Sequence, residues 1–471
     1  NSSTTDPSTT DTTLGAKIET TYATYISSSQ PADTYTGQVK YTMVHPYTEQ
    51  PLQPQTTEPG KICYYANASN AEGTMGCQGI SASTTSAMLF ASNFSRSGYG
   101  FAGWSDSFDY ATNPQANLYG PNETISFAAG QYTDNNQGLS LYAVWIKSVG
   151  SFQDDSVVSR LCGSDSESLT LVNYNAETGE LSANLSSVSA LTDQRDNQTY
   201  AIAKLADGNC WMIENLRLDN TTELTTLNTN NPLNDNSQTN PTVTLKHNYA
   251  DIQTYDTLSA TSSVAYDPDT APDGWCNESS ASCNDQSRLR TDNTTNRAAY
   301  TTGQSMSNRA VNIYSYGNYY NWYSATAGRG VYEKNSSDAE GDICPRGWKL
   351  PYGNTGSSSG NKGGTSGGLS YLDKTMGGTG TSNSNNTITG KTMSSYWRQF
   401  PNNYVFSGYM SGASIDYRGT IGISWSSTPY GRSGAYTVFI NVTGLRPGTL
   451  NSYDNDKDGG KTLRCVVKSG S

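Results

Sequence analysis

Three aspartates near the C-terminus have the spacing that comes closest to a known metal-binding pattern. Asp454, Asp456 and Asp458, followed by Gly459, match the start of a calcium loop, in which alternate carboxylates converge on one ion. The twelfth position of such a loop holds a bidentate glutamate, but here it holds Cys465. Calcium is the only cofactor that the sequence suggests, and an acidic β-turn without metal is the favoured alternative.

Residues suited to acid–base or nucleophilic catalysis are sparse. The two histidines, His45 and His247, lie far apart in loop-like sequence, and activation of a serine or cysteine needs a neighbouring base. Among the scattered carboxylates, Glu214 is notable because it lies within DGNCWMIENLRL (Asp207–Leu218). A glutamate with such apolar neighbours is expected to bond the backbone or Arg217 inside the fold. The sequence therefore predicts a protein that is not an enzyme.

Eight cysteines, an even number, are typical of an oxidised, secreted protein. The chain has no CxxC pair and only two histidines, so a zinc site is disfavoured. The order of the cysteines along the chain predicts four disulfides: Cys63–Cys77, Cys162–Cys210, Cys276–Cys283 and Cys344–Cys465.

The composition argues against two classes of partner, nucleic acids and a membrane-spanning environment. The net charge of −12 disfavours phosphate backbones, so nucleic acid is not an expected partner. No run of about 18 apolar residues is present, so no membrane span is expected in this chain. Tyrosine outnumbers phenylalanine 33 to 9, and tyrosine suits exposed sheets because it buries a ring while its hydroxyl stays in water.

The elements that position these residues are mainly strands, in a multidomain, β-rich chain. Residues 1–50 combine a Ser/Thr-rich tail with two strand-like segments, Ile18–Ile26 and Gly37–Val44, which must complete a sheet elsewhere. Residues 51–147 form the next domain, and residues 148–190 read as a connector with weak strands. The last domain, residues 191–471, is α+β with long loops rich in Gly, Ser, Asn and Thr; short helices are expected at Leu369–Met376 and Lys391–Phe400.

Two segments of the second domain resemble the Listeria–Bacteroides repeat, the internalin-type B repeat. They are GYGFAGW (Gly98–Trp104) and LYAVW (Leu141–Trp145). The resemblance implies a small β-grasp-like module of a bacterial surface protein. From the residues alone, the aromatic side chains are expected to be core residues on strands: Phe101, Trp104, Tyr142 and Trp145.

The last domain resembles the Fibrobacter succinogenes major paralogous domain. The segments that carry the resemblance are DGNCWMIEN (Asp207–Asn215), YGNYYNWYSA (Tyr316–Ala325), CPRGWKLP (Cys344–Pro351), WSST (Trp425–Thr428) and RCV (Arg464–Val466). This family implies a relative of the C-type-lectin-like fold. The pairing of the two domains implies a surface protein of bacteria, including Saccharibacteria. The sugar-binding calcium motifs of animal lectins are absent, which weakens a lectin prediction based on fold alone.

These observations predict an extracellular, cell-surface structural or adhesion protein, with an extracellular filament subunit as a specific form. In that form, Ile18–Ile26 or Gly37–Val44 adds a strand to a neighbouring copy, a head-to-tail contact that can propagate. The alternative is that both segments pack on their own chain. A glycan-binding module, or an enzyme of unknown type, remains a competing function. Host or neighbour-cell glycans or proteins would then be the partners, and the candidate contact residues are Tyr316, Tyr319, Tyr320, Tyr323, Tyr404 and Tyr417. The favoured alternative is that most of these tyrosines are core or ordinary surface residues.

Overall fold

The structure is a computed structural model, and its described part begins at residue 54. It describes residues 54–217 except 135–136 and 165–167. It also describes residues 314–467 except 321, 327–337, 340–341, 355–361, 382–386, 389, 412–413, 431–433, 450–455 and 458. The strand predictions in residues 1–50 and the predicted Cys276–Cys283 disulfide therefore lie outside the described residues. All described residues fall within one compact unit, Glu49–Ser471.

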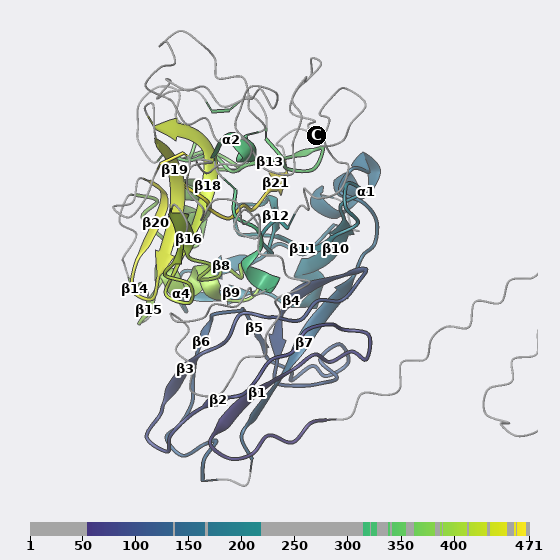
Figure 1. Cartoon of the computed structure of the whole chain (residues 1–471), viewed down its shortest axis with the longest axis vertical. Helices are drawn as coiled ribbons and strands as arrows, with labels where there is room; N and C mark the ends of the chain where they lie inside the picture. Colours follow the sequence, from purple (N-terminus) through teal and green to yellow (C-terminus); the bar gives the residue numbers. More distant parts are fainter. Residues whose placement is uncertain are drawn as a thin grey trace, which may run out of the picture. The chain divides into compact units, whose positions relative to one another are not determined.

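A five-stranded sheet organises the first module, which we define as residues 54–147. Its strand order is β2-β1-β7-β4-β5, and β1 and β7 pair in parallel while the other pairs are antiparallel (Figure 1). A separate pair, β3 (Ser86–Met88) and β6 (Thr124–Ser126), completes the module. The sheet strands are β1 (Lys61–Tyr65), β2 (Gln78–Gly79), β4 (Tyr99–Ser105), β5 (Leu118–Tyr119) and β7 (Leu139–Lys147).

Aromatic side chains from β4 and β7 fill the core of this module. Trp104 is fully buried, donates from Nε1 to the carbonyl of Phe90 at 2.9 Å, and meets Phe101 edge to face with ring centroids 5.0 Å apart. Tyr142 and Trp145 are also buried, so the sequence prediction of four core aromatics is confirmed.

A second five-stranded sheet has the order β10-β11-β12-β21-β13. It belongs to the described residues from 148 to 467, which we call the C-terminal part. Helix α1 (Asp155–Cys162) precedes this sheet. It corrects the prediction for residues 148–190, which was a connector with weak strands. Asp154 caps this helix by accepting the N–H groups of Ser156 and Val157, which is a recognisable helix-start signal. The sheet strands are β10 (Val188–Thr192), β11 (Thr199–Lys204), β12 (Cys210–Met212), β13 (Trp348–Lys349) and β21 (Val466–Val467).

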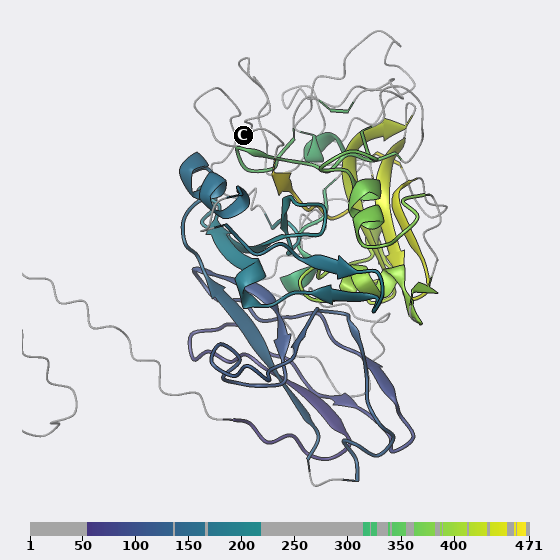
Figure 2. The same cartoon turned by 180° about the vertical axis from the view of Figure 1, so that it is seen from behind.

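A three-stranded antiparallel sheet, β18-β19-β20, forms the other half of the C-terminal part (Figure 2). Its strands are β18 (Ile421–Tyr430), β19 (Gly434–Asn441) and β20 (Leu445–Thr449). Helices α3 (Leu369–Thr375) and α4 (Met393–Arg398) confirm the two predicted helical segments. The shorter elements are β8 (Asn173–Asn175), β9 (Glu180–Ser182), η1 (Leu185–Ser187), η5 (Tyr314–Tyr316), α2 (Trp322–Ala325), β14 (Thr387–Ile388), β15 (Lys391–Thr392), β16 (Tyr409–Ser411) and β17 (Ser414–Asp416).

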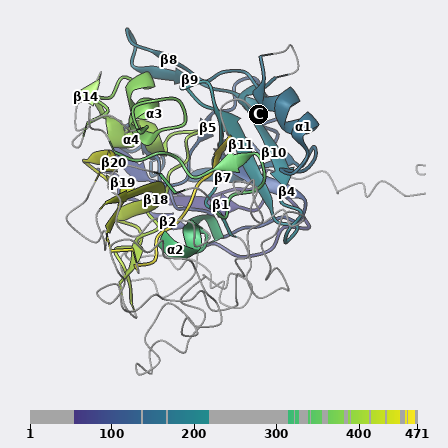
Figure 3. The same cartoon turned by 90° about the horizontal axis from the view of Figure 1, so that it is seen from above.

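The first module and the C-terminal part approach each other at backbone distance. Strand β4 contacts β10 and β11, and the three strands lie close together in the view from above (Figure 3). A Cβ atom added at Gly100 on β4 would lie 2.3 Å from the backbone nitrogen of Ala201 on β11. Only glycine allows this approach, so the two sheets are packed as parts of one compact unit.

Candidate functional site

Glu214 links the two sheets through a single buried carboxylate. Its Oε2 atom accepts the N–H of Phe101 on β4 at 3.1 Å and the N–H of Ala201 on β11 at 2.6 Å. Nη1 of Arg217 donates to its other oxygen, Oε1, at 3.0 Å. The sequence prediction that Glu214 bonds the backbone or Arg217 inside the fold is confirmed.

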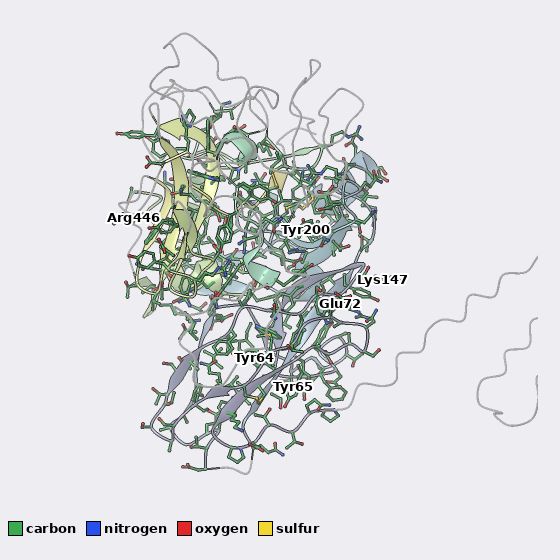
Figure 4. The ribbon with its side chains drawn as sticks, in the orientation of Figure 1. Tyr64, Tyr65, Glu72, Lys147, Tyr200 and Arg446 are labelled. Atoms are coloured by element: carbon green, nitrogen blue, oxygen red, sulfur yellow. A yellow bond between two sulfur atoms is a disulfide. The ribbon has the colours of Figure 1, made fainter. Side chains whose placement is uncertain are left out.

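Arg217 is itself held on several sides. Its Nη2 atom donates to the carbonyl of Thr199 at 2.9 Å, and its guanidinium lies 4.4 Å from the ring centroid of Tyr200 and 4.0 Å from that of Tyr314 (Tyr200 is labelled in Figure 4). Burial raises the pKa of Glu214, and the charge of Arg217 opposes that rise. Because both carboxylate oxygens are bonded within the protein, this arrangement suits a structural link better than an acid–base catalyst.

Arg464, near the end of the chain, forms a second buried link. Its Nε atom donates to Oδ1 of Asn215 at 2.8 Å, and its two terminal nitrogens donate to the carbonyls of Asn402 and Asn403 at 2.5 Å. Asn403 then donates from Nδ2 to the carbonyl of Ala102 on β4 at 2.7 Å. Backbone groups of adjacent residues on β4 are thus bonded by Glu214 and by Asn403, and both partners come from the C-terminal part.

Arg398, at the end of α4, forms a third link to the first module. It donates to the carbonyl of Asn122 and to Oγ1 of Thr124, the latter at 3.2 Å. Asn122 is fully buried and accepts the N–H of Phe406 at Oδ1 at 2.8 Å. The three links together use buried polar groups, which stabilise one geometry only when all partners are in place.

Three disulfides lie among the described cysteines, as the order of the cysteines predicted. Cys63–Cys77 closes a loop beside β1, Cys162–Cys210 ties α1 to β12, and Cys344–Cys465 ties the CPRGW segment to the residue before β21. Their sequence separations are 14, 48 and 121 residues. The longest therefore joins segments that the linear sequence leaves far apart.

Burial removes four of the six candidate contact tyrosines, in agreement with the alternative that most of them are core or ordinary surface residues. Four of them are at most 3% exposed and belong to the protein interior: Tyr316, Tyr319, Tyr320 and Tyr404. Rings in these positions offer no surface to a ligand, because neighbouring groups such as Arg464, 4.1 Å from the Tyr404 ring centroid, already cover them. Tyr417 is 49% exposed, and the side chain of Tyr323 lies outside the described set.

Tyr417 has an uncommon backbone for a bulky residue, with φ at +59°. Its carbonyl accepts the N–H groups of Thr420 and Ile421, each at 3.1 Å, which fixes the turn before β18. Its ring stacks on that of Tyr409, with centroids 5.9 Å apart and an interplanar angle of 15°. The exposed ring therefore packs against a buried neighbouring ring.

The predicted calcium loop lies mostly outside the described residues. Asp454 and Asp458 are not described, and Asp456 is exposed. Among the described residues, no group of three His, Cys, Asp or Glu side chains could hold a metal ion. Lys457 lies between these aspartates and is fully buried, 4.6 Å from the ring centroid of Trp322. The calcium site stays a prediction.

Sequence reasoning missed the polar residues that join the first module to the C-terminal part. Asn122, Arg398 and Asn403 carry no motif, and their partners are separated from them by more than 270 residues. The useful signal was a charged residue beside an aromatic one: Arg398 follows Trp397 in the predicted helical segment and is 1% exposed.

In the described part of the chain, no helix is both long and apolar enough to cross a membrane. Comparisons with protein-family models, with curated proteins and with solved structures found no match.

Proposed function

We propose that this protein is a secreted or cell-surface bacterial protein with a structural or adhesive, non-catalytic role. The three disulfides carry the proposal, because cystines persist in oxidising, extracellular environments. The buried links of Glu214, Arg398 and Arg464 support the structural, non-catalytic part of this proposal, because these charged side chains are used for contacts inside the protein. The residues resembling the Listeria–Bacteroides repeat and the Fibrobacter paralogous domain favour the same role.

Assembly into an extracellular filament is the specific form of this role that we propose. Strand addition needs an open sheet edge. Strand β4 lies between β7 and β5, and its Phe101 N–H and Ala102 carbonyl are already bonded by Glu214 and Asn403. An incoming strand from a neighbouring copy must therefore use another edge. The proposed donor is Ile18–Ile26 or Gly37–Val44, within the first 50 residues.

Deletion of residues 1–30 tests this assembly. The full chain and the deleted chain are compared by electron microscopy and by sedimentation at high concentration. We expect fibres from the full chain and their loss on deletion. Fibres that persist without residues 1–30, or a full chain that stays monomeric at high concentration, would exclude strand donation by Ile18–Ile26.

Glycan binding is a second candidate function, and the orientation of Tyr417 favours it. An exposed aromatic ring held by stacking supplies contact area at low entropic cost, and backbone outliers cluster at functional sites. A glycan array with the wild-type chain, with and without calcium, would be compared with Tyr417→Ala. The control is Tyr430→Ala, because Tyr430 is 45% exposed. Binding that survives Tyr417→Ala would remove this ring from the site.

A further inference from the structure

Strands β1 and β7 are the first and last strands of the first module along the chain, and they pair in parallel. The pairing runs from Ile62 beside Leu139 to Tyr65 beside Tyr142. The chain enters the sheet at the start of β1 and leaves it at the end of β7, and in a parallel pair those two points lie at opposite ends. Tension along the chain therefore drives the two strands past each other and loads all four residue pairs together.

The C-terminal part holds the first module at the end of β7 that lies beyond β1. Phe101 on β4 pairs with Trp145 near that end, and its N–H is the one that Glu214 accepts. Immediately after β7, the N–H of Val149 donates to the carbonyl of Ala190 on β10 at 3.0 Å. In Figure 1, β1 lies in the lower half, and β10 and β11 lie above β7. The C-terminal part and the start of β1 thus load opposite ends of the β1–β7 pair.

Tyr64 anchors β1 in the core of the first module. Its ring contacts the rings of Phe90 and Trp104, whose centroids lie 5.2 Å and 5.0 Å away. Its hydroxyl accepts the N–H of Phe90 at 2.8 Å and donates to Oε1 of Gln78 on β2 at 2.9 Å (Tyr64 is labelled in Figure 4). The residue is 3% exposed, so β1 cannot slide along β7 until this ring leaves its close-packed site and loses both hydrogen bonds.

Two further contacts secure the same strand. Tyr65, which follows on the opposite face of the sheet, stacks on the ring of Tyr142 of β7 with centroids 5.5 Å apart. On the other side of Tyr64 in the sequence, Cys63 is bonded to Cys77, the residue before β2. A load on β1 is therefore shared with β2, and the disulfide prevents residues 64–76 from being extended.

We propose that the β1–β7 pair is a load-bearing clamp, which keeps the first module folded under tension between the start of β1 and the C-terminal part. Parallel pairing, a buried ring that blocks sliding and a covalent tie to β2 all act on one strand. The use of the clamp rests on the proposed cell-surface role, because a structural or adhesive protein is held at two points. The mechanical resistance itself depends only on the fold.

Single-molecule force spectroscopy of the full chain, pulled in two directions, tests the clamp. In the shear arrangement, the pulling handles are attached to p-azidophenylalanine in place of Glu58 and Val149, so β1 and β7 are driven past each other. In the peeling arrangement they are attached in place of Glu58 and Gln137, which precede β1 and β7, so the residue pairs separate one after another. All three residues are exposed. At the same loading rate, we expect a rupture force about two- to fourfold higher in shear, since four residue pairs resist together.

Reduction of the disulfide identifies the rupture of β1 in the shear arrangement. Cys63 and Cys77 are the only cysteines between residues 58 and 149, so reduction of the other cystines does not change the chain length between the handles. The extension released on rupture should increase by about 50 Å after reduction, the length of 14 extended residues. An unchanged extension would show that the load does not pass through β1, and the clamp would then be wrongly assigned to this strand.

Tyr64→Phe keeps the ring but removes the hydroxyl, so it should lower the rupture force in shear. The matched control is Tyr110→Phe, which removes a hydroxyl bonded to the backbone of Trp145, beyond the pairs with β1, and should leave the rupture force unchanged.

Equal rupture forces in the two arrangements would overturn the clamp, and this comparison needs no change in the core. A rupture force that Tyr64→Phe leaves unchanged would contradict the part assigned to Tyr64. Neither measurement depends on where the protein is located, so a failed clamp would leave the proposed cell-surface role untouched.

Discussion

Replacing Glu214 by glutamine should leave Arg217 without its buried counter-charge. The two side chains are each 3% exposed, and Nη1 of Arg217 lies 3.0 Å from Oε1 of Glu214. Removing one partner of a buried pair costs about 3–5 kcal/mol, because the remaining charge is uncompensated. The glutamine carbonyl can still accept the N–H groups of Phe101 and Ala201, but its NH₂ group would then face the guanidinium. We therefore expect Glu214→Gln to lower the free energy of unfolding by about 3–5 kcal/mol.

Urea unfolding followed by tryptophan fluorescence measures this loss, with the m-value checked for a constant unfolding reaction. The matched double variant is Glu214→Gln with Arg217→Met, in which the amide no longer opposes a cation. Its loss should be smaller than the sum of the two single losses by about 1–3 kcal/mol. The role of this pair as an internal link would be refuted if Glu214→Gln lowered the free energy of unfolding by less than about 1 kcal/mol. Strict additivity of the two single losses in the double variant would refute it as well.

The remaining predictions concern packing, covalent ties and a buried lysine. Gly100→Ala should destabilise the protein by about 1–3 kcal/mol in urea unfolding, since the new Cβ would lie 2.3 Å from the nitrogen of Ala201; an unchanged midpoint would contradict the close approach. Replacing Cys344 and Cys465 by serine opens a loop of 121 residues and should cost about 5 kcal/mol in the same assay, whereas a loss under 1 kcal/mol would argue against the disulfide. Burial lowers the pKa of Lys457 from 10.5 to about 7, so the folded chain binds fewer protons than the unfolded chain between these pH values. The free energy of unfolding should therefore rise from pH 7 to pH 10 relative to that of Lys457→Met. Parallel pH profiles for the two proteins would contradict this.

Local patterns predicted local structure well. The helical segments at Leu369–Met376 and Lys391–Phe400 became α3 and α4, because short apolar repeats fix which face is buried. The aromatic positions of β4 and β7 became core for the same reason. Helix α1 was missed although the sequence held its signals, since Asp154 supplies a cap and Val158 and Leu161 supply a buried face.

Contacts between distant segments could not be read from the sequence. Glu214 was expected to bond the backbone or Arg217, and Arg217 is three residues away. The sequence did not indicate which backbone group it would bond, and the hydrogen bond from Phe101 to Glu214 spans 113 residues. The tyrosine-rich segment around Tyr316 allowed either a contact surface or a place in the core, because tyrosine suits both. Tertiary packing decided between them, and a single sequence holds no direct record of that packing.

The extracellular location of the protein and the oxidation of its described cysteines can be tested together in one measurement. Intact source cells are treated with a membrane-impermeant amine-reactive label, and the protein is then recovered and mapped without reduction. We expect a labelled chain that contains Cys63–Cys77, Cys162–Cys210 and Cys344–Cys465 as cystines. An unlabelled chain with free thiols at these six positions would contradict an extracellular, disulfide-tied protein.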